Sequence, residues 1–227
     1  MYRIAIALIV ILCNLWNVKC VQFNAGRFIV NGFNKPIEPS ESDFPHQTAL
    51  LAQVNGTELI FCGGSLIHPR WVLTAAHCLE QDGKQFPTSL LKVAVGSIYS
   101  DLRGGQKLDV KETIIHKAYF ESSASHDIGL IKLKRFVKLS SLVNSIRLHT
   151  NTSENLLGQT VYLTGLGFIN DFSRKPERLR KAILHVNTPD KCFIDPTKDA
   201  TQLCCTSTLF EGKACKVRTN RVVNGYE

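Results

Sequence analysis

The hydrophobic positions of this chain fall in short runs that are separated by turn residues. From residue 43 onward these runs are Thr48–Val54, Leu59–Ile67, Trp71–Thr74, Leu90–Val95 and Lys107–Ile115. Apolar runs of this length and spacing are typical of an all-β barrel or sandwich. The pattern alone does not choose between these two architectures.

The first 20 residues have the pattern of a secretory signal peptide. Arg3 precedes an apolar core at Ile4–Leu12, and cleavage is expected near Cys20. That core is too short to cross a bilayer, and no later stretch approaches the roughly 18 to 20 apolar residues that a membrane helix needs. We therefore expect a secreted, extracellular protein with no membrane partner, in which disulfides can form.

The charge balance is basic but does not indicate nucleic-acid binding. The full chain has a formal net charge of +8. Removing Arg3 and Lys19 with the signal peptide leaves 25 of the 27 basic residues against 19 acidic ones. Apart from a basic run at 174–181, the charge is scattered along the sequence, and no aromatic stacking pattern accompanies that run. We interpret the run as a solvated loop that enters a strand.

Two neighbouring segments stand out. Phe61-Cys62-Gly63-Gly64-Ser65-Leu66 ends a strand-like run in small residues, and Thr74-Ala75-Ala76-His77-Cys78 places a histidine directly before a cysteine. They resemble the CGGSL strand and the TAAHC segment of the chymotrypsin-like serine proteases, the trypsin family. The resemblance implies that His77 is the general base of a catalytic triad.

The resemblance extends along most of the chain. Ser125–Leu133 is similar to the family's DIALIKL segment, which implies that Asp127 orients the histidine and stabilises its protonated form. Gly158–Gly167 is similar to a strand that ends in TGWG, with Leu166 in place of tryptophan, and a strand at Arg180–Asn187 follows. The implied fold is all-β, with two six-stranded antiparallel barrels and the catalytic groups in the cleft between them.

The resemblance also implies disulfides. A Cys62–Cys78 bridge would close a loop of about 15 residues, worth about 3 kcal/mol in the chain-entropy model. Cys192 should bond to Cys204 or Cys205, and the family spacing to Cys215 favours Cys205. Cys204 and Cys215 then have no assigned partner. The histidines and cysteines lack metal-ligand spacing, so we expect no metal and no cofactor.

The pattern breaks where the family has its GDSGGP nucleophile motif. Thr219 falls at the serine position by count, but Val217 replaces the glycine that forms the oxyanion hole, and Arg218 replaces the following aspartate. We therefore do not expect Thr219 to act as a nucleophile. The second barrel is expected to be incomplete at its C-terminal strands, which would leave an open edge.

Both ends of the protease-like region are unusual. Phe28 stands between Arg27 and an Ile29-Val30-Asn31-Gly32 start, so activation cleavage after Arg27 and cleavage after Phe28 both remain open. Residues 221–227 look like the start of a second protease unit. The expected organisation is a signal peptide at 1–20, an activation segment at 21–28, a truncated protease domain at 29–215 and an aberrant tail at 216–227.

Three hypotheses fit these observations. In the first, the chain is a member of the serine endopeptidase family, which acts on proteins or peptides, but is inactive in this form. In the second, it is a non-catalytic homologue that binds peptides or regulates proteases. In the third, it is a mis-joined product of an active protease gene. Asn55 and Asn151 begin glycosylation sequons, which suit a secreted protein. Neither substrate specificity nor oligomeric state follows from the sequence.

Overall fold

The structure is a computed structural model that describes residues 40, 42–120, 125–150, 155–166, 177–192 and 203–206. The strands in this part of the chain are β1 (Gln47–Val54), β2 (Thr57–His68), β3 (Trp71–Thr74), β4 (Glu80–Gln81), β5 (Lys84–Gln85), β6 (Leu91–Val95), β7 (Gln106–Ile115), β8 (Gly129–Leu133), β9 (Thr160–Gly165), β10 (Arg180–Val186) and β11 (Cys205–Thr206). Short 3-10 helices are η1 (Ala76–Cys78), η2 (Thr88–Leu90) and η3 (Pro189–Cys192). The strands expected from the apolar runs are all present.

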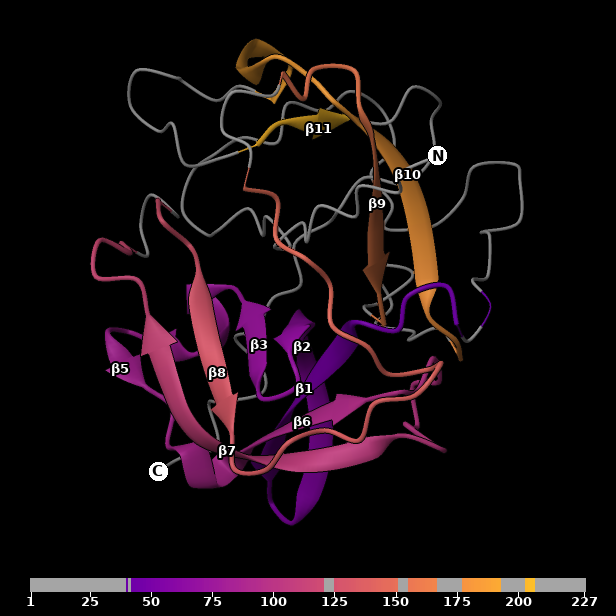
Figure 1. Ribbon diagram of the computed structural model, residues 1–227. Coiled ribbons are helices and arrows are strands. Elements are labelled where there is room, and N and C mark those ends of the chain that lie inside the picture. Colours follow the sequence, from indigo (N-terminus) through magenta and orange to yellow (C-terminus); the bar gives the residue numbers. More distant parts are fainter. Residues whose placement is uncertain are drawn as a thin grey trace.

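Six strands close into an antiparallel barrel in the order β1-β2-β3-β8-β7-β6, with β6 pairing back to β1 (Figure 1). Side chains alternate between the interior and the surface along these strands. In β7, for example, Leu108 and Val110 are each 1% exposed, whereas Lys107 and Asp109 face outward. Because of this alternation, a short strand in which only every second residue is apolar can bury one face in the barrel interior.

The hairpin between β1 and β2 shows how local sequence sets the register of the barrel. Asn55 and Gly56 have φ values of +49° and +77°. Two successive positive φ values are the mark of a type I′ turn, which Asn-Gly adopts readily because glycine has no Cβ. The turn pairs Val54 with Thr57 and so fixes the start of the ladder that leads to Cys62.

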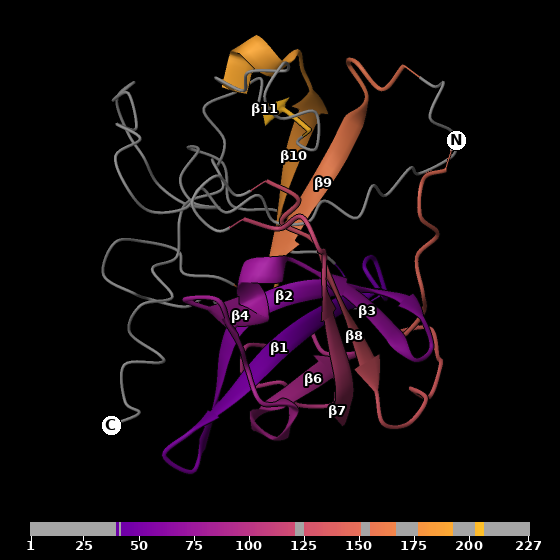
Figure 2. The same ribbon diagram turned by 90° about the vertical axis from the view of Figure 1, so that its left-hand side faces the viewer.

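A second sheet, in the order β11-β10-β9, stands above the barrel (Figure 2). It has three antiparallel strands in the described residues, and its core contains Val161, Leu163, Ala182, Leu184 and Val186. The expected all-β class is confirmed. No helix among the described residues is long and apolar enough to cross a membrane.

A shared apolar cluster joins the two sheets. Ala49, Leu51 and Ala94 point out of the barrel and pack with Leu166 and Leu179 of the second unit. Leu166, which replaces the tryptophan of the resembled motif, is 6% exposed in this cluster. Across the same junction, the Thr164 hydroxyl donates to Gln47 Oε1 at 2.5 Å, and the Leu179 N–H donates to the Ile98 carbonyl at 2.5 Å.

The predicted pairing of Cys205 is wrong. Cys205 is a free thiol, and its neighbour Cys204 is the residue in a disulfide. Cys205 begins β11, where it pairs with Val186, and it is half-buried, whereas Cys204 is 2% exposed. Successive side chains of an extended segment point to opposite sides, so only one of two adjacent cysteines can face a given partner.

Several sequence predictions lie outside the described residues. They are the signal peptide at 1–20, the activation segment at 21–28, Asn151, the side chain of Cys192, Cys215, Thr219 and the tail at 216–227. They remain predictions.

Candidate active site

His77 lies on η1, the short helix that follows β3. β3 ends at Thr74, whose hydroxyl donates to the Gly63 carbonyl of β2 at 2.8 Å. The backbone at Ala75 is extended, and Ala76 is fully buried. Small buried residues at 75 and 76 let the chain turn tightly against the barrel, which directs His77 to the end of the barrel that faces the second sheet.

The second glycine of the CGGSL segment has a packing role beside this turn. A Cβ at Gly64 would lie 2.8 Å from the Leu73 carbonyl oxygen and 2.9 Å from Thr48 Oγ1. Contacts this short do not occur for a real Cβ, so the strands approach here only because residue 64 is glycine. The glycine in this motif is therefore required by the packing of the strands that support His77.

Asp127 reaches the same end of the barrel from the neighbouring strand. β3 pairs with β8, and Thr74 lies opposite Gly129 in that ladder. His77 follows the end of β3 and Asp127 precedes the start of β8, so the antiparallel pairing places the two residues side by side. The backbone before β8 is held by a hydrogen bond from the His116 N–H to the Ile128 carbonyl at 3.1 Å.

Both oxygens of the Asp127 carboxylate accept a hydrogen bond from His77. Imidazole Nδ1 lies 2.7 Å from Oδ2, and the backbone N–H donates to Oδ1 at 2.9 Å. The side chains are 7% exposed for His77 and 11% for Asp127. An ionised carboxylate only accepts hydrogen bonds, so the proton of the neutral ring sits on Nδ1, and Nε2 keeps its lone pair. This is the arrangement of a general base and its orienting acid.

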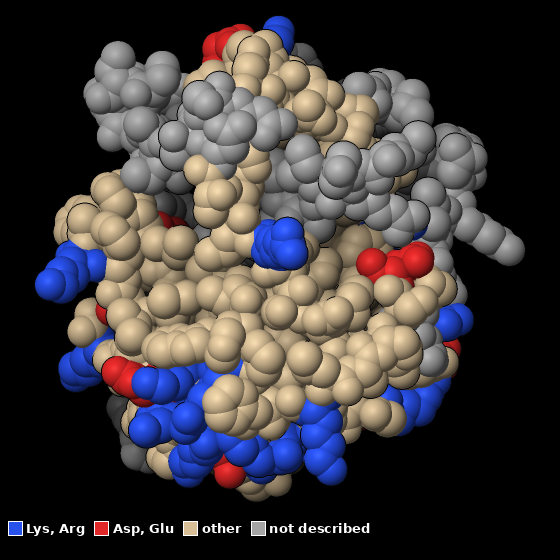
Figure 3. All heavy atoms as spheres, viewed as in Figure 1, with Lys and Arg blue, Asp and Glu red and all other residues tan. Residues whose placement is uncertain are grey.

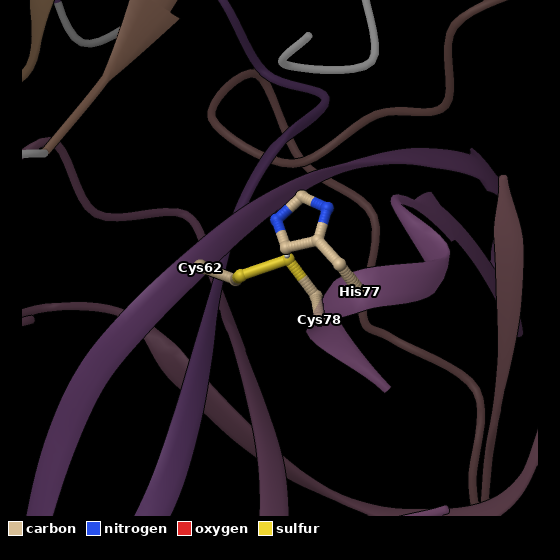
Figure 4. Close-up of side chains that lie close together, drawn as sticks. All are labelled: Cys62, His77 and Cys78. Carbon is tan, nitrogen blue, oxygen red and sulfur yellow. Dashed lines mark hydrogen bonds between the residues drawn. A yellow bond between two sulfur atoms is a disulfide. The ribbon is translucent and has the colours of Figure 1, made fainter. Parts of the chain in front are cut away.

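The Cys62–Cys78 disulfide, predicted from the sequence, is present and lies directly beside the ring (Figure 4). Nε2 of His77 is 3.4 Å from Cys78 Sγ. A disulfide sulfur has no proton to donate, so this contact leaves the Nε2 lone pair available. Possible ligand atoms of Cys62, His77 and Cys78 lie within 4.8 Å of one another, but the sulfurs are bonded to each other and offer no thiolate to a metal.

A histidine pair next to the site was not recognised in the sequence. His126 directly precedes Asp127 and has a φ of +54°, and its ring stacks on His116 with centroids 4.8 Å apart. The Ser125 hydroxyl lies 2.8 Å from His126 Nδ1. Positive φ is uncommon for residues other than glycine, although histidine is among the residues enriched there. No motif signals this stack, because the two residues are ten positions apart on opposite arms of a loop.

Asn55, the first residue of a predicted sequon, lies at the exposed tip of the β1–β2 hairpin. Its side chain is therefore accessible to modification. Glycosylation of Asn55 remains a prediction.

A closed six-stranded barrel that holds a largely but not fully buried His–Asp pair beside a disulfide, with a second β-sheet packed above it, defines a chymotrypsin-like serine protease fold. A sequence profile described as Trypsin matches residues 32–216. This chain belongs to the trypsin family.

Similar proteins agree with this assignment. Serine protease SP24D of Anopheles gambiae is 33% identical over 176 residues, which cover 78% of this chain and 61% of that protein. Vitamin K-dependent protein C of Rattus norvegicus is 35% identical over 72% of this chain and 34% of its own length. The chain thus spans less than two thirds of both relatives.

Solved structures show the same fold. Neuropsin, a serine protease expressed in the limbic system of mouse brain, has a TM-score of 0.59 and 27% identity to this chain. The match covers 77% of this chain and 74% of neuropsin.

Proposed function

We propose that this chain is a secreted serine-endopeptidase-type domain, spanning residues 29–215, that has two members of a catalytic triad but does not cleave peptide bonds as its sequence stands. The geometry of His77 and Asp127 supports the first part. The second part rests on the sequence after Cys215, where Lys216-Val217-Arg218-Thr219 replaces the expected nucleophile motif. Its substrates, as for the family, would be proteins or peptides.

The chemistry that the pair supports is proton abstraction from a hydroxyl. Nε2 of His77 would take the proton as the oxygen attacks a carbonyl carbon, and Asp127 would stabilise the imidazolium that forms. A triad acts as a unit, and loss of the serine alone reduces turnover by about 10⁶ in the subtilisin case. The base and its partner therefore support no appreciable turnover without a nucleophile.

A fluorophosphonate probe tests the proposal directly, because it forms a covalent adduct only with an activated serine or threonine hydroxyl. The processed protein should give no adduct, and its ester hydrolysis should equal that of the His77→Ala variant. An adduct that requires His77 would show that the chain has a working nucleophile. The adduct site, mapped by mass spectrometry, would then identify that residue.

Sequencing of the transcript across the codons for Gly212 to Glu227 distinguishes the two origins of the missing motif. Reads that insert a GDSGGP segment would identify this sequence as a mis-joined form of an active endopeptidase. Reads that reproduce the junction favour an inactive homologue, and peptide binding by the purified chain would then be the function to measure.

A further inference from the structure

Basic residues that are scattered in the sequence gather on one outer face of the barrel. Figure 3 shows Lys and Arg side chains crowded along the lower part of the molecule. We call this surface the basic face. Lys107 and Lys111 lie on β7, and Arg70 lies directly before β3. Its other members, in the segment that follows β8, are Lys134, Arg135 and Lys138.

Hydrogen bonds hold the segment after β8 against β7. The Arg135 guanidinium donates to the Lys107 carbonyl at 3.1 Å, and the Lys138 N–H donates to Gln106 Oε1 at 2.9 Å. The Lys134 N–H donates to the Asp109 carbonyl of β7 at 2.9 Å. The segment after β8 is thereby fastened along β7, and cations from two separate stretches of sequence become neighbours.

The two arginines are held by backbone carbonyls. Arg70 donates to the Leu133 carbonyl at 2.9 Å and to the Lys134 carbonyl at 3.1 Å. A carbonyl carries no net charge, so the guanidinium is positioned but not neutralised. Its remaining N–H groups can bind a carboxylate.

Carboxylates on this face neutralise only part of the charge. Glu58 accepts from Lys107 at 2.5 Å and from Lys92 at 2.8 Å, and these bonds lower its pKa. Asp109 faces outward between Lys107 and Lys111. Four other cations of the basic face are exposed: Lys111, Lys134, Arg135 and Lys138. Among the described residues, no carboxylate lies within ion-pair distance of any of these four side chains.

Exposed apolar side chains interrupt the cations. Phe136 is 58% exposed and Leu139 is 52% exposed, although Val137 between them is buried. The Arg70 guanidinium lies 5.3 Å from the centre of the Phe136 ring and holds it in place. A ligand that makes full use of this surface must carry both negative charge and apolar groups.

The basic face lies away from the active site. Asp127 precedes β8 and Lys134 follows it, so the five residues of β8 separate them by about 15 Å. A ligand on the basic face therefore leaves the His77 side of the barrel open.

We infer that the basic face is a docking site for an extended acidic peptide segment that carries aromatic or aliphatic side chains. Its carboxylates pair with Lys111, Lys134 and Lys138, and its apolar side chains cover Phe136 and Leu139. A sulfated polysaccharide would meet the charges but has no apolar groups to cover Phe136. Nucleic acid would require aromatic rings that are free to stack on bases, and Arg70 already lies over the Phe136 ring.

Fluorescence anisotropy of the full chain tests this inference. The probe is a fluorescein-labelled peptide of about twelve residues in which Glu and Asp alternate with Phe and Leu, and a second probe has serine at the apolar positions. The double variant Lys134→Glu/Lys138→Glu should weaken binding of the first peptide at least about tenfold, and Phe136→Ser about threefold. The serine peptide should bind the wild type more weakly than the first peptide.

Lys84→Glu/Lys191→Glu is the matched control, because it makes the same charge change at exposed lysines elsewhere. It should leave the affinity within about twofold of wild type. Absence of peptide binding at low salt, or equal weakening by the control, would overturn the inference. So would equal binding of the two peptides, or a heparin hexasaccharide that binds the wild type more tightly than the acidic-apolar peptide.

Discussion

His77 and Asp127 are 50 positions apart in the sequence and share two hydrogen bonds, one from the ring and one from the backbone. The backbone bond fixes the carboxylate relative to the main chain, and the ring bond fixes the tautomer. A carboxylate can accept both at once because each oxygen takes one donor.

Asp127→Asn should disturb both bonds. A carboxamide has only one acceptor oxygen, so either the ring or the backbone N–H of His77 loses its partner. Two-bond ¹H–¹⁵N spectra should show the Nδ1–H tautomer in the neutral wild-type ring and a shift toward Nε2–H in the variant. Urea unfolding should show a loss of about 1–3 kcal/mol. Asp190→Asn, at an exposed position, is the control, and an unchanged His77 tautomer would contradict the prediction.

Removal of the Cys62–Cys78 bridge should lower the free energy of unfolding by about 3 kcal/mol, because its sequence separation of 16 corresponds to a loop of about 15 residues. The comparison is between the oxidised wild type and Cys62→Ala/Cys78→Ala by urea denaturation. Cys205→Ala removes a cysteine without removing a bridge and serves as the control. A loss no larger than in the control would show that the bridge does not stabilise the fold.

Among the cysteines whose side chains the structure describes, Cys205 has the free thiol and should be the one that reacts with an alkylating reagent in the non-reduced protein. Burial raises its pKa to about 11, so the thiol is protonated near neutral pH and alkylation should be slow, then accelerate as the pH rises toward 11. Mass spectrometry after alkylation without reduction should find the label on Cys205 and none on Cys204. Label on Cys204 in the folded protein would contradict the structure.

His46 should make the protein less stable in mild acid. Burial lowers the pKa of its imidazole to about 4, whereas the unfolded chain has the ordinary value of 6.5. The unfolded state therefore binds a proton first, and stability that is present above pH 6.5 is lost as the pH falls toward 4, by at most about 3 kcal/mol. Urea unfolding between these pH values should show a smaller loss for His46→Gln. If the free energy of unfolding fell equally with decreasing pH in the wild type and the variant, His46 would be excluded as the cause of the acid sensitivity.

Leu179→Ala should weaken the junction between the barrel and the second sheet. Leu179 is fully buried in the cluster that both units share, and truncation of a buried leucine typically costs 2–5 kcal/mol. Leu157→Ala, at a position that is 52% exposed, is the matched control and should change the stability by less than about 1 kcal/mol. Equal effects of the two substitutions in urea unfolding would mean that the shared cluster does not stabilise the protein.

Much of the fold could be predicted because its signals are local. Short apolar runs between turn residues indicate strands wherever they occur. The Asn55-Gly56 turn is also a local signal, although we had identified Asn55 only as the start of a sequon. Gly64 and the small residues before His77 lie in two short segments close together in the sequence, so the family resemblance could be seen there. The His–Asp pairing was predicted from that resemblance, since no local rule joins residues so far apart.

The sequence by itself determined the all-β class and the strands through its local patterns, and its resemblance to the trypsin family indicated the Cys62–Cys78 bridge, His77 and Asp127. Only the tertiary structure decided which of Cys204 and Cys205 is bonded, because the choice depends on the side of the strand each sulfur faces. It also decided that His126 stacks on His116 and that scattered lysines and arginines form one basic face. Closure of the barrel brings separate strands into register, and the distances between their side chains follow from that closure and not from their spacing in the sequence.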